Sequence, residues 1–194
     1  NISPDRNLIY VSTNGTNIAT GVTWTANTWM DISMTFDLDE GEMSLDILNS
    51  DTKQVILSAQ KYTFSKNILI KELRFVTWNT DSTYIDDLSI APYVVDLNVF
   101  RDDFEYADTT AGIAAGWVNA NDSSTLGTTE FVKVSDSDSH GKSMKITKNT
   151  DNSGTKRAIS MPNTGKYQVK MSAYVEKELY LQLLHASSYL MHLR

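Results

Sequence analysis

Aromatic side chains in polar surroundings are the residues of this sequence best suited to recognising a ligand. Threonines flank Trp24, and a threonine and an asparagine flank Trp78, which is typical of half-exposed rings. Tyr174 falls on the polar phase of an alternating segment, and Tyr189 lies in a later one. Exposed rings stack on flat ligands such as sugars. We therefore expect these four residues to contact a glycan, the alternative being that an opposing sheet covers them.

Side chains arranged for catalysis are not evident. The three histidines, His140, His185 and His192, fit no metal-binding spacing, and no pattern singles out the carboxylate pair of a glycosidase. There is no nucleophile-elbow motif and no phosphate-binding glycine loop. The chain has no cysteine, which excludes disulfides, thiolate metal sites and cysteine nucleophiles. The sequence predicts a protein that is not an enzyme.

The charge balance narrows the range of partners. The 194 residues carry a net charge of −7 and no cluster of Lys and Arg, so nucleic acid is not expected as a partner. No apolar run approaches the ~18 residues of a membrane span. An acidic composition suits a protein that is soluble outside the cell and binds calcium.

The elements that must position these residues are predicted from a hydrophobic period of two. Apolar and polar residues alternate over 30–36, 43–47 and 167–175, which places one set of side chains in a core and the other toward solvent. A short helix is predicted only around 108–115. Turn signals between many short segments predict an all-β fold, a sandwich or a barrel. Further strands are expected over 8–12, 54–58, 68–77, 84–90, 130–135, 143–147, 157–161, 179–184 and 188–193.

The composition shifts near Pro92. Residues 92–101 are predicted to be a connector between two halves of roughly equal length, 1–91 and 102–194. Neither half is a simple repeat of the other.

Several short motifs resemble one family. The jelly-roll carbohydrate-binding modules of secreted bacterial polysaccharide-degrading enzymes open on an acidic D-F-E strand and close on a Y-I-D-D-(V/L) strand. The chain has Asp103-Phe104-Glu105, then Gly116-Trp117, and later Tyr84-Ile85-Asp86-Asp87-Leu88 as a closing strand. Two further matches are His140-Gly141-Lys142-Ser143-Met144-Lys145-Ile146 and Gly165-Lys166-Tyr167-Gln168-Val169. The resemblance implies a jelly-roll β-sandwich of the concanavalin or galactose-binding type.

The order of the motifs is permuted relative to that family. Residues 102–194 resemble the front half of a module and residues 1–91 the back half. Two arrangements remain open: the halves pack together as one permuted domain, or each is completed by a neighbouring unit of a tandem array. In either case the chain is expected to be a piece of a longer protein. The family positions of Trp29 and Trp117 imply that both rings lie in the core.

The resemblance also implies a structural calcium ion. The matching ligands are Glu105, Asp86 and Asp103, with a backbone carbonyl near Lys142. Asp86 shares its alternation phase with Leu88, so we expect its carboxylate on the inner face, where it needs a partner or a metal. Asp87 is expected to face solvent. The alternative is that these are ordinary surface carboxylates at strand ends.

The sequence thus predicts a non-catalytic, calcium-containing module that binds a polysaccharide, secreted by or displayed on a bacterial cell. The alternative is a structural or adhesive repeat of a cell-surface or filamentous assembly, completed by neighbouring copies because a half module leaves strand edges unpaired. A polysaccharide lyase or hydrolase is a third and weaker hypothesis.

Overall fold

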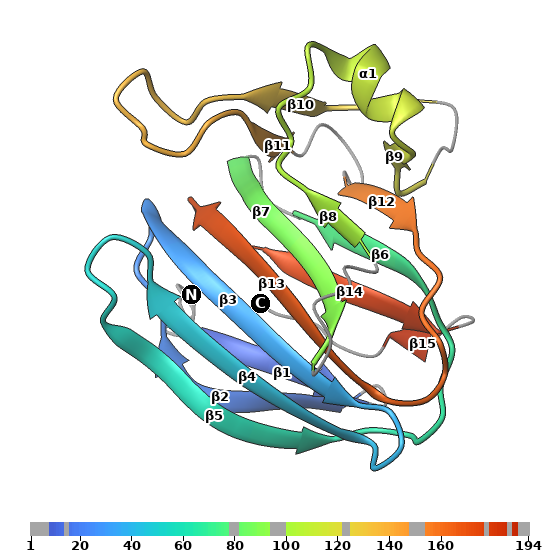
Figure 1. Cartoon of the computed structure of the whole chain (residues 1–194). Helices are drawn as coiled ribbons and strands as arrows, with labels where there is room; N and C mark the ends of the chain where they lie inside the picture. The colour runs from blue at the N-terminus through green and yellow to red at the C-terminus, as the bar shows by residue number, and fades with distance from the viewer. Residues whose placement is uncertain are drawn as a thin grey trace, which may run out of the picture.

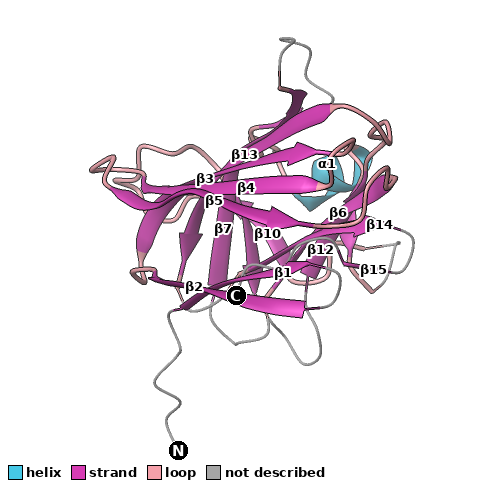
Figure 2. Ribbon diagram, turned by 90° about the horizontal axis from the view of Figure 1, so that it is seen from below, coloured by secondary structure: helices cyan, strands magenta, loops and turns pink. Residues whose placement is uncertain are grey.

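The computed structural model describes residues 8–13, 16–77, 82–93, 100–121, 125–147, 154–176, 179–185 and 188–189. These residues form antiparallel β-sheets and one short helix, α1 (Thr109–Ala114), so the all-β prediction is confirmed. Asp108 caps α1, and its side chain accepts a hydrogen bond from the backbone N–H of Ala111 at 2.9 Å. Figure 2 shows α1 at one end of the sheets. Within the described residues, no helix is both long enough and apolar enough to cross a bilayer.

The strands of the described residues are arranged in three sheets (Figure 1). The largest has the order β10-β11-β7-β13-β3-β4-β5, with β8 also paired to β7; the second has the order β15-β14-β6-β12-β9; the third is the hairpin β1-β2. The strands are β1 (Leu8–Thr13), β2 (Thr16–Thr23), β3 (Thr28–Asp37), β4 (Glu42–Asn49), β5 (Val55–Thr63), β6 (Ile70–Val76), β7 (Ser82–Pro92), β8 (Phe100–Asp102), β9 (Trp117–Asn119), β10 (Thr129–Val132), β11 (Ser143–Thr147), β12 (Gly154–Ala158), β13 (Lys166–Val175), β14 (Tyr180–His185) and β15 (Ser188–Tyr189).

The centre of the eight-stranded sheet is built from distant parts of the chain. Strand β13 pairs with β3 along its whole length and with β7 on its other side. In Figure 1 the three strands, blue, orange-red and green, lie side by side. Strands of residues 1–91 and of residues 102–194 therefore alternate within one sheet, and β6 pairs with both β12 and β14 in the second sheet.

The hydrophobic core takes side chains from both large sheets. Alternate residues of β3 and β4 supply Met34 and Leu45, while β6 and β14 supply Phe75 and Leu183, and all four are completely buried. The β1–β2 hairpin adds Ile9 and Val11 to the same cluster. Period-two alternation predicts this directly, since each strand turns one face inward.

A bulge in β7 changes the expected direction of one acid. Ile85 and Leu88 both belong to the core cluster although they are three residues apart. The extra residue is accommodated at Asp87, whose φ is +50°, and the pairing with β13 shifts register at this point. Asp86 therefore pairs with Ser172 on the outer face of the sheet, the face turned away from the core. The prediction that Asp86 shares the inner phase of Leu88 was wrong for this reason.

Candidate functional site

Three aromatic rings form a row across the outer face of the eight-stranded sheet. Tyr174 of β13 is the register partner of Trp29 on β3 and of Tyr84 on β7. Its ring centroid lies 5.7 Å from each of theirs, in edge-to-face geometry. The outward phase predicted for Tyr174 is confirmed, but the ring is half-buried between its two neighbours.

A loop that precedes β11 covers one end of this row. The His140 ring stacks on the Trp29 indole at a centroid distance of 4.0 Å, and the indole Nε1 donates to Asp138 Oδ2 at 2.9 Å. Burial alone raises the pKa of Asp138, but hydrogen bonds from His140 and Trp29 outweigh it and hold that pKa below the usual value. Trp29 is buried, as expected, but it is covered by this loop on the outer face and lies outside the core cluster.

Two of the predicted calcium ligands come together beside this loop. Glu105 Oε1 accepts a hydrogen bond from the backbone N–H of Lys142 at 2.6 Å. The carboxylate lies where a side chain of residue 141 would stand, because a Cβ on Gly141 would overlap Glu105 Oε1. Only glycine permits this approach. Lys142 contributes its N–H here, and its Nζ donates to the carbonyl of Tyr106 at 2.7 Å.

Asp86 is electrostatically coupled to the same group. It is 5% exposed, and burial raises its pKa to about 6, with the negative charges of Asp87 and Glu105 adding to the rise. The N–H of Asp87, 2.8 Å from Asp86 Oδ1, and His140 act in the opposite direction. A buried carboxylate with a second acid nearby is costly to ionise unless a cation offsets the charge.

Ser143 supplies an additional unpaired oxygen. Met144 on β11 pairs with Ile85 on β7, so in the antiparallel ladder Ser143 is the neighbour of Asp86. Ser143 is completely buried, and its Oγ has no hydrogen-bond partner. Sequence reasoning did not single it out; its place next to Lys142 in the family motif was the available signal.

These donors suit calcium. Within the described part of the chain, no three acidic, histidine or cysteine side chains are grouped to hold a metal. Calcium does not need such a group, because it combines a few carboxylates with hydroxyl, carbonyl and water oxygens. Asp86, Glu105 and the orphaned Ser143 hydroxyl are oxygens of that kind.

The predicted ligand Asp103 and its neighbour Asp102 lie in different environments. Asp103 is exposed, whereas Asp102 is 6% exposed and accepts hydrogen bonds from several donors. The Trp117 indole Nε1 lies 2.7 Å and the Tyr106 hydroxyl 2.5 Å from Asp102 Oδ2. The Phe104 N–H and the Arg157 guanidinium complete the set at 2.9 Å and 3.4 Å. Trp117 is fully buried in the core cluster, as the sequence predicts.

A polar groove of about 550 Å³ extends over the outer face next to the aromatic row. Three serines line it, Ser33, Ser89 and Ser172, one from each of β3, β7 and β13, together with the apolar residues Ile32, Leu48 and Met171. Charged side chains stand along it: Asp31, Asp46, Asp87, Arg101 and Lys170. Its volume falls in the range of ligand sites, but the described residues that line it include no aromatic side chain.

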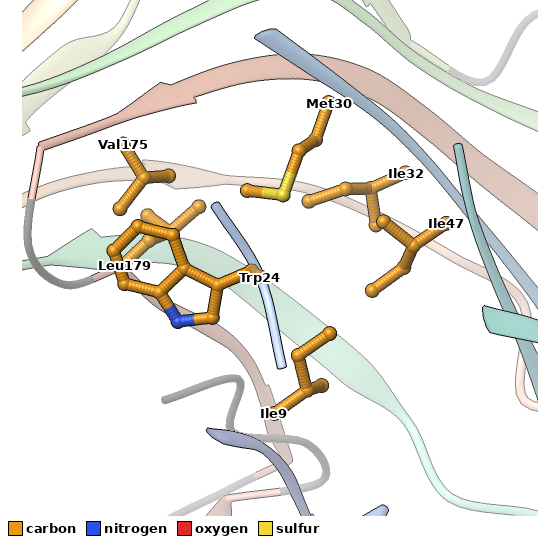
Figure 3. A pocket seen from close by; sticks show the side chains of 7 residues that line it. All are labelled: Ile9, Trp24, Met30, Ile32, Ile47, Val175 and Leu179. Carbon is orange, nitrogen blue, oxygen red and sulfur yellow. The ribbon is translucent and has the colours of Figure 1, made fainter. Parts of the chain in front are cut away.

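Trp24 is not the half-exposed platform that its polar neighbours indicated. Its ring is 7% exposed and belongs to the core cluster. It lines a small apolar cavity of about 30 Å³ beneath the β1–β2 hairpin, together with Ile9 and Val175 (Figure 3). The threonines on either side of Trp24 are exposed where the chain turns from β2 to β3, but the side chain of Trp24 between them is buried. Trp78 and the side chains of Tyr189 and His185 lie outside the described residues, as does His192.

Comparison of the chain with models of known protein families found no match, and comparison with curated proteins found no relative. The functional interpretation therefore depends on the site itself.

Proposed function

We propose that this chain is a non-catalytic carbohydrate-binding module of the jelly-roll sandwich type, and that its glycan lies in the polar groove on the outer face of the eight-stranded sheet. The observation that carries the proposal is the groove. It is large enough for a sugar chain, and hydroxyl, carboxylate and cationic groups line it from neighbouring strands. Such groups hydrogen-bond to sugar hydroxyls in both directions, as donors and as acceptors.

The rigidity of the groove supports this assignment. Ser172 Oγ donates to Asp31 Oδ1 at 3.1 Å, and Lys53 pairs with the other oxygen of Asp31 at 2.9 Å. Asp46 accepts from the backbone N–H of Ala59 at 2.8 Å. These acids are held in place before any ligand arrives, and a pre-ordered site loses less conformational entropy on binding.

The cation belongs to the same proposal. Asp86 lies on the outer face and is electrostatically coupled to Glu105, and the next residue after Asp86, Asp87, lines the groove. A calcium ion held there by Asp86, Glu105 and Ser143 fixes the bulge of β7 and the loop that carries His140. Its role is to stabilise the end of the groove.

The groove is tested by blocking it. Ser89 lies in the middle of the floor on β7, and Ala91 is two residues further on the same outward phase but outside the groove. We expect Ser89→Trp to abolish retention on the polysaccharides that the unaltered protein binds, and Ala91→Trp to leave it unchanged. Retention of Ser89→Trp at full strength, or failure of the unaltered protein on a broad panel of plant, algal and bacterial glycans, would reject the proposal.

The adhesive-repeat hypothesis lacks support from the strand order. That hypothesis was based on the strand edges that a half module would leave unpaired. However, β13 of the later half lies hydrogen-bonded between β3 and β7 of the earlier half. A monomer in light scattering is the expected result for the module; a regular oligomer would favour the repeat.

A further inference from the structure

The strand register fixes the order of five polar and charged side chains across the groove. One row of register partners crosses the sheet: Arg101 on β8, Ser89 on β7, Lys170 on β13, Ser33 on β3 and Asp46 on β4. All five line the groove. Arg101 is at the β8 end of this row, Lys170 is on its central strand with Ser89 between the two, and Asp46 is at the β4 end.

Two of the three acids that line the groove, Asp31 and Asp46, already have partners, whereas its two cations have no carboxylate partner among the described residues. Asp31 is paired with Lys53, and Asp46 accepts hydrogen bonds from the Ala59 N–H and from Ser58 Oγ. Among the described residues, by contrast, neither Arg101 nor Lys170 makes an ion pair with a carboxylate. Among the described residues, Arg101 and Lys170 therefore stand on either side of Ser89 without a carboxylate partner, although Asp87 lines the same groove and the chain as a whole carries a net charge of −7.

The spacing of these cations suits one small planar anion. Arg101 and Lys170 each neighbour Ser89, so their backbones are two strand spacings apart, ~10 Å. Ser89 is short, and both long side chains can lean over it from either side. A carboxylate above the Ser89 hydroxyl would accept a forked pair of hydrogen bonds from the guanidinium and one from the ammonium group.

We propose that the groove selects a carboxylated glycan, a polyuronate, with one sugar carboxylate held between Arg101 and Lys170. The sugar hydroxyls then lie toward Ser33 and Asp46, whose oxygens accept from them. This inference depends on the proposed glycan-binding function and adds its substrate class. A polymer with several sulfates per sugar would be repelled by the acidic β4 end, whereas one carboxylate per sugar matches one cationic pair.

The test compares one oligosaccharide in two charge states. An oligogalacturonide and its fully methyl-esterified form have the same linkage and length, and their affinities for the protein are measured by calorimetry at low salt. We expect the ester to bind at least about tenfold more weakly than the acid, because it loses charge-assisted hydrogen bonds. A sulfated oligosaccharide of similar length is expected to bind no better than the ester.

The matched variants are Arg101→Gln, Lys170→Gln and, as control, Lys71→Gln. Lys71 is exposed on β6 of the other sheet, so its replacement makes the same change in net charge away from the groove. We expect Arg101→Gln and Lys170→Gln each to weaken binding of the acid about tenfold or more and to leave binding of the ester nearly unchanged. Lys71→Gln should affect neither, and all three should melt like the unaltered protein.

The outcomes separate the two proposals. Equal binding of acid and ester, or an effect of Arg101→Gln no larger than that of Lys71→Gln, overturns the carboxylate assignment and leaves the glycan-binding function standing. Preference for the sulfated chain also overturns it. Absence of binding to any charged or neutral glycan overturns both.

Discussion

The imidazole of His140 stacks on the indole of Trp29 at a centroid distance of 4.0 Å, which joins the loop before β11 to the outer face of the large sheet. Asp138 reinforces the contact by accepting from the Trp29 Nε1 and from the His140 N–H. The contacts among Trp29, Asp138 and His140 hold this loop over one end of the surface that carries Asp86, Glu105 and the groove.

The network predicts a stability loss in acid. Because hydrogen bonds hold the folded-state pKa of Asp138 below its unfolded value of 3.8, its contribution is present above about pH 4 and is lost as the pH falls through the folded pKa. We expect Asp138→Asn to melt lower than the unaltered protein at pH 7 and to differ from it less at pH 3. The pH series of melting temperatures measures this, and a constant difference between the two proteins would contradict it.

Two adjacent aspartates should differ sharply in their effect on folding. Asp102→Ala leaves the Trp117 and Tyr106 donors and Arg157 without their acceptor in a buried site, which should cost about 3–5 kcal/mol. Asp103→Ala alters an exposed side chain and should cost within about 0.5 kcal/mol. Urea unfolding of the two variants compares them directly. Equal losses in the free energy of unfolding would show that the hydrogen bonds to Asp102 do not stabilise the fold.

Calcium should stabilise the protein through Asp86 and Glu105. At a free concentration 100 times the dissociation constant, binding to the folded state alone adds about 2.7 kcal/mol, or roughly 5–10 °C in melting temperature for a chain of this size. Asp86→Asn and Glu105→Gln should remove most of the shift between calcium and chelator, whereas the exposed Asp103→Asn should keep it. Ser143→Ala should reduce the shift. A full shift in Asp86→Asn would place the ion elsewhere.

The pH profile without metal follows from the raised pKa of Asp86. A carboxyl whose folded pKa is about 6 favours the folded state below its unfolded pKa of 3.8, and that contribution is lost as the pH rises to about 6. Two pKa units correspond to about 3 kcal/mol as an upper bound. In chelator, Asp86→Asn should therefore be the more stable protein at pH 7 and gain nothing at pH 4. In calcium at pH 7 the order should reverse.

The apolar cavity beside Trp24 offers a stabilising substitution. Its volume of about 30 Å³ is close to one methylene group, and cavity volume costs ~24 cal/mol per Å³. Val175→Ile should gain up to about 0.7 kcal/mol in urea unfolding by filling it. Val169→Ile, at a fully buried position of the same strand that does not line the cavity, should gain nothing.

Period-two alternation was enough to predict the all-β fold, because each strand has one buried and one outer face. It predicted strands β3, β4, β13 and β14, and it predicted that Tyr174 points to the outer face. It failed at Asp86, since the alternation assumes an unbroken strand and the bulge at Asp87 is not visible in residue types. It also could not separate Trp24 from Trp29: both are buried, one in the core and one under a loop, and burial on the outer face depends on distant residues such as His140.

The site was predicted only in part for a similar reason. Glu105 and Lys142 meet as the motif resemblance implied, although through the N–H of Lys142. Sequence reasoning missed the groove because most of its residues are serines and charged residues spread over five strands, and only the register places Arg101, Ser89 and Lys170 in one row.

The insertion of β13 between β3 and β7 also governs how the chain folds. Residues 28–37 and 82–92 are synthesised long before 166–175, and until that segment leaves the ribosome neither strand has its central partner. Pairing across such sequence separations requires closure of long loops, which slows folding of β-rich proteins. Until then, the edges of β3 and β7 that pair with β13 remain without their partner. Translation stalled before residue 166 should therefore release a product that aggregates instead of folding.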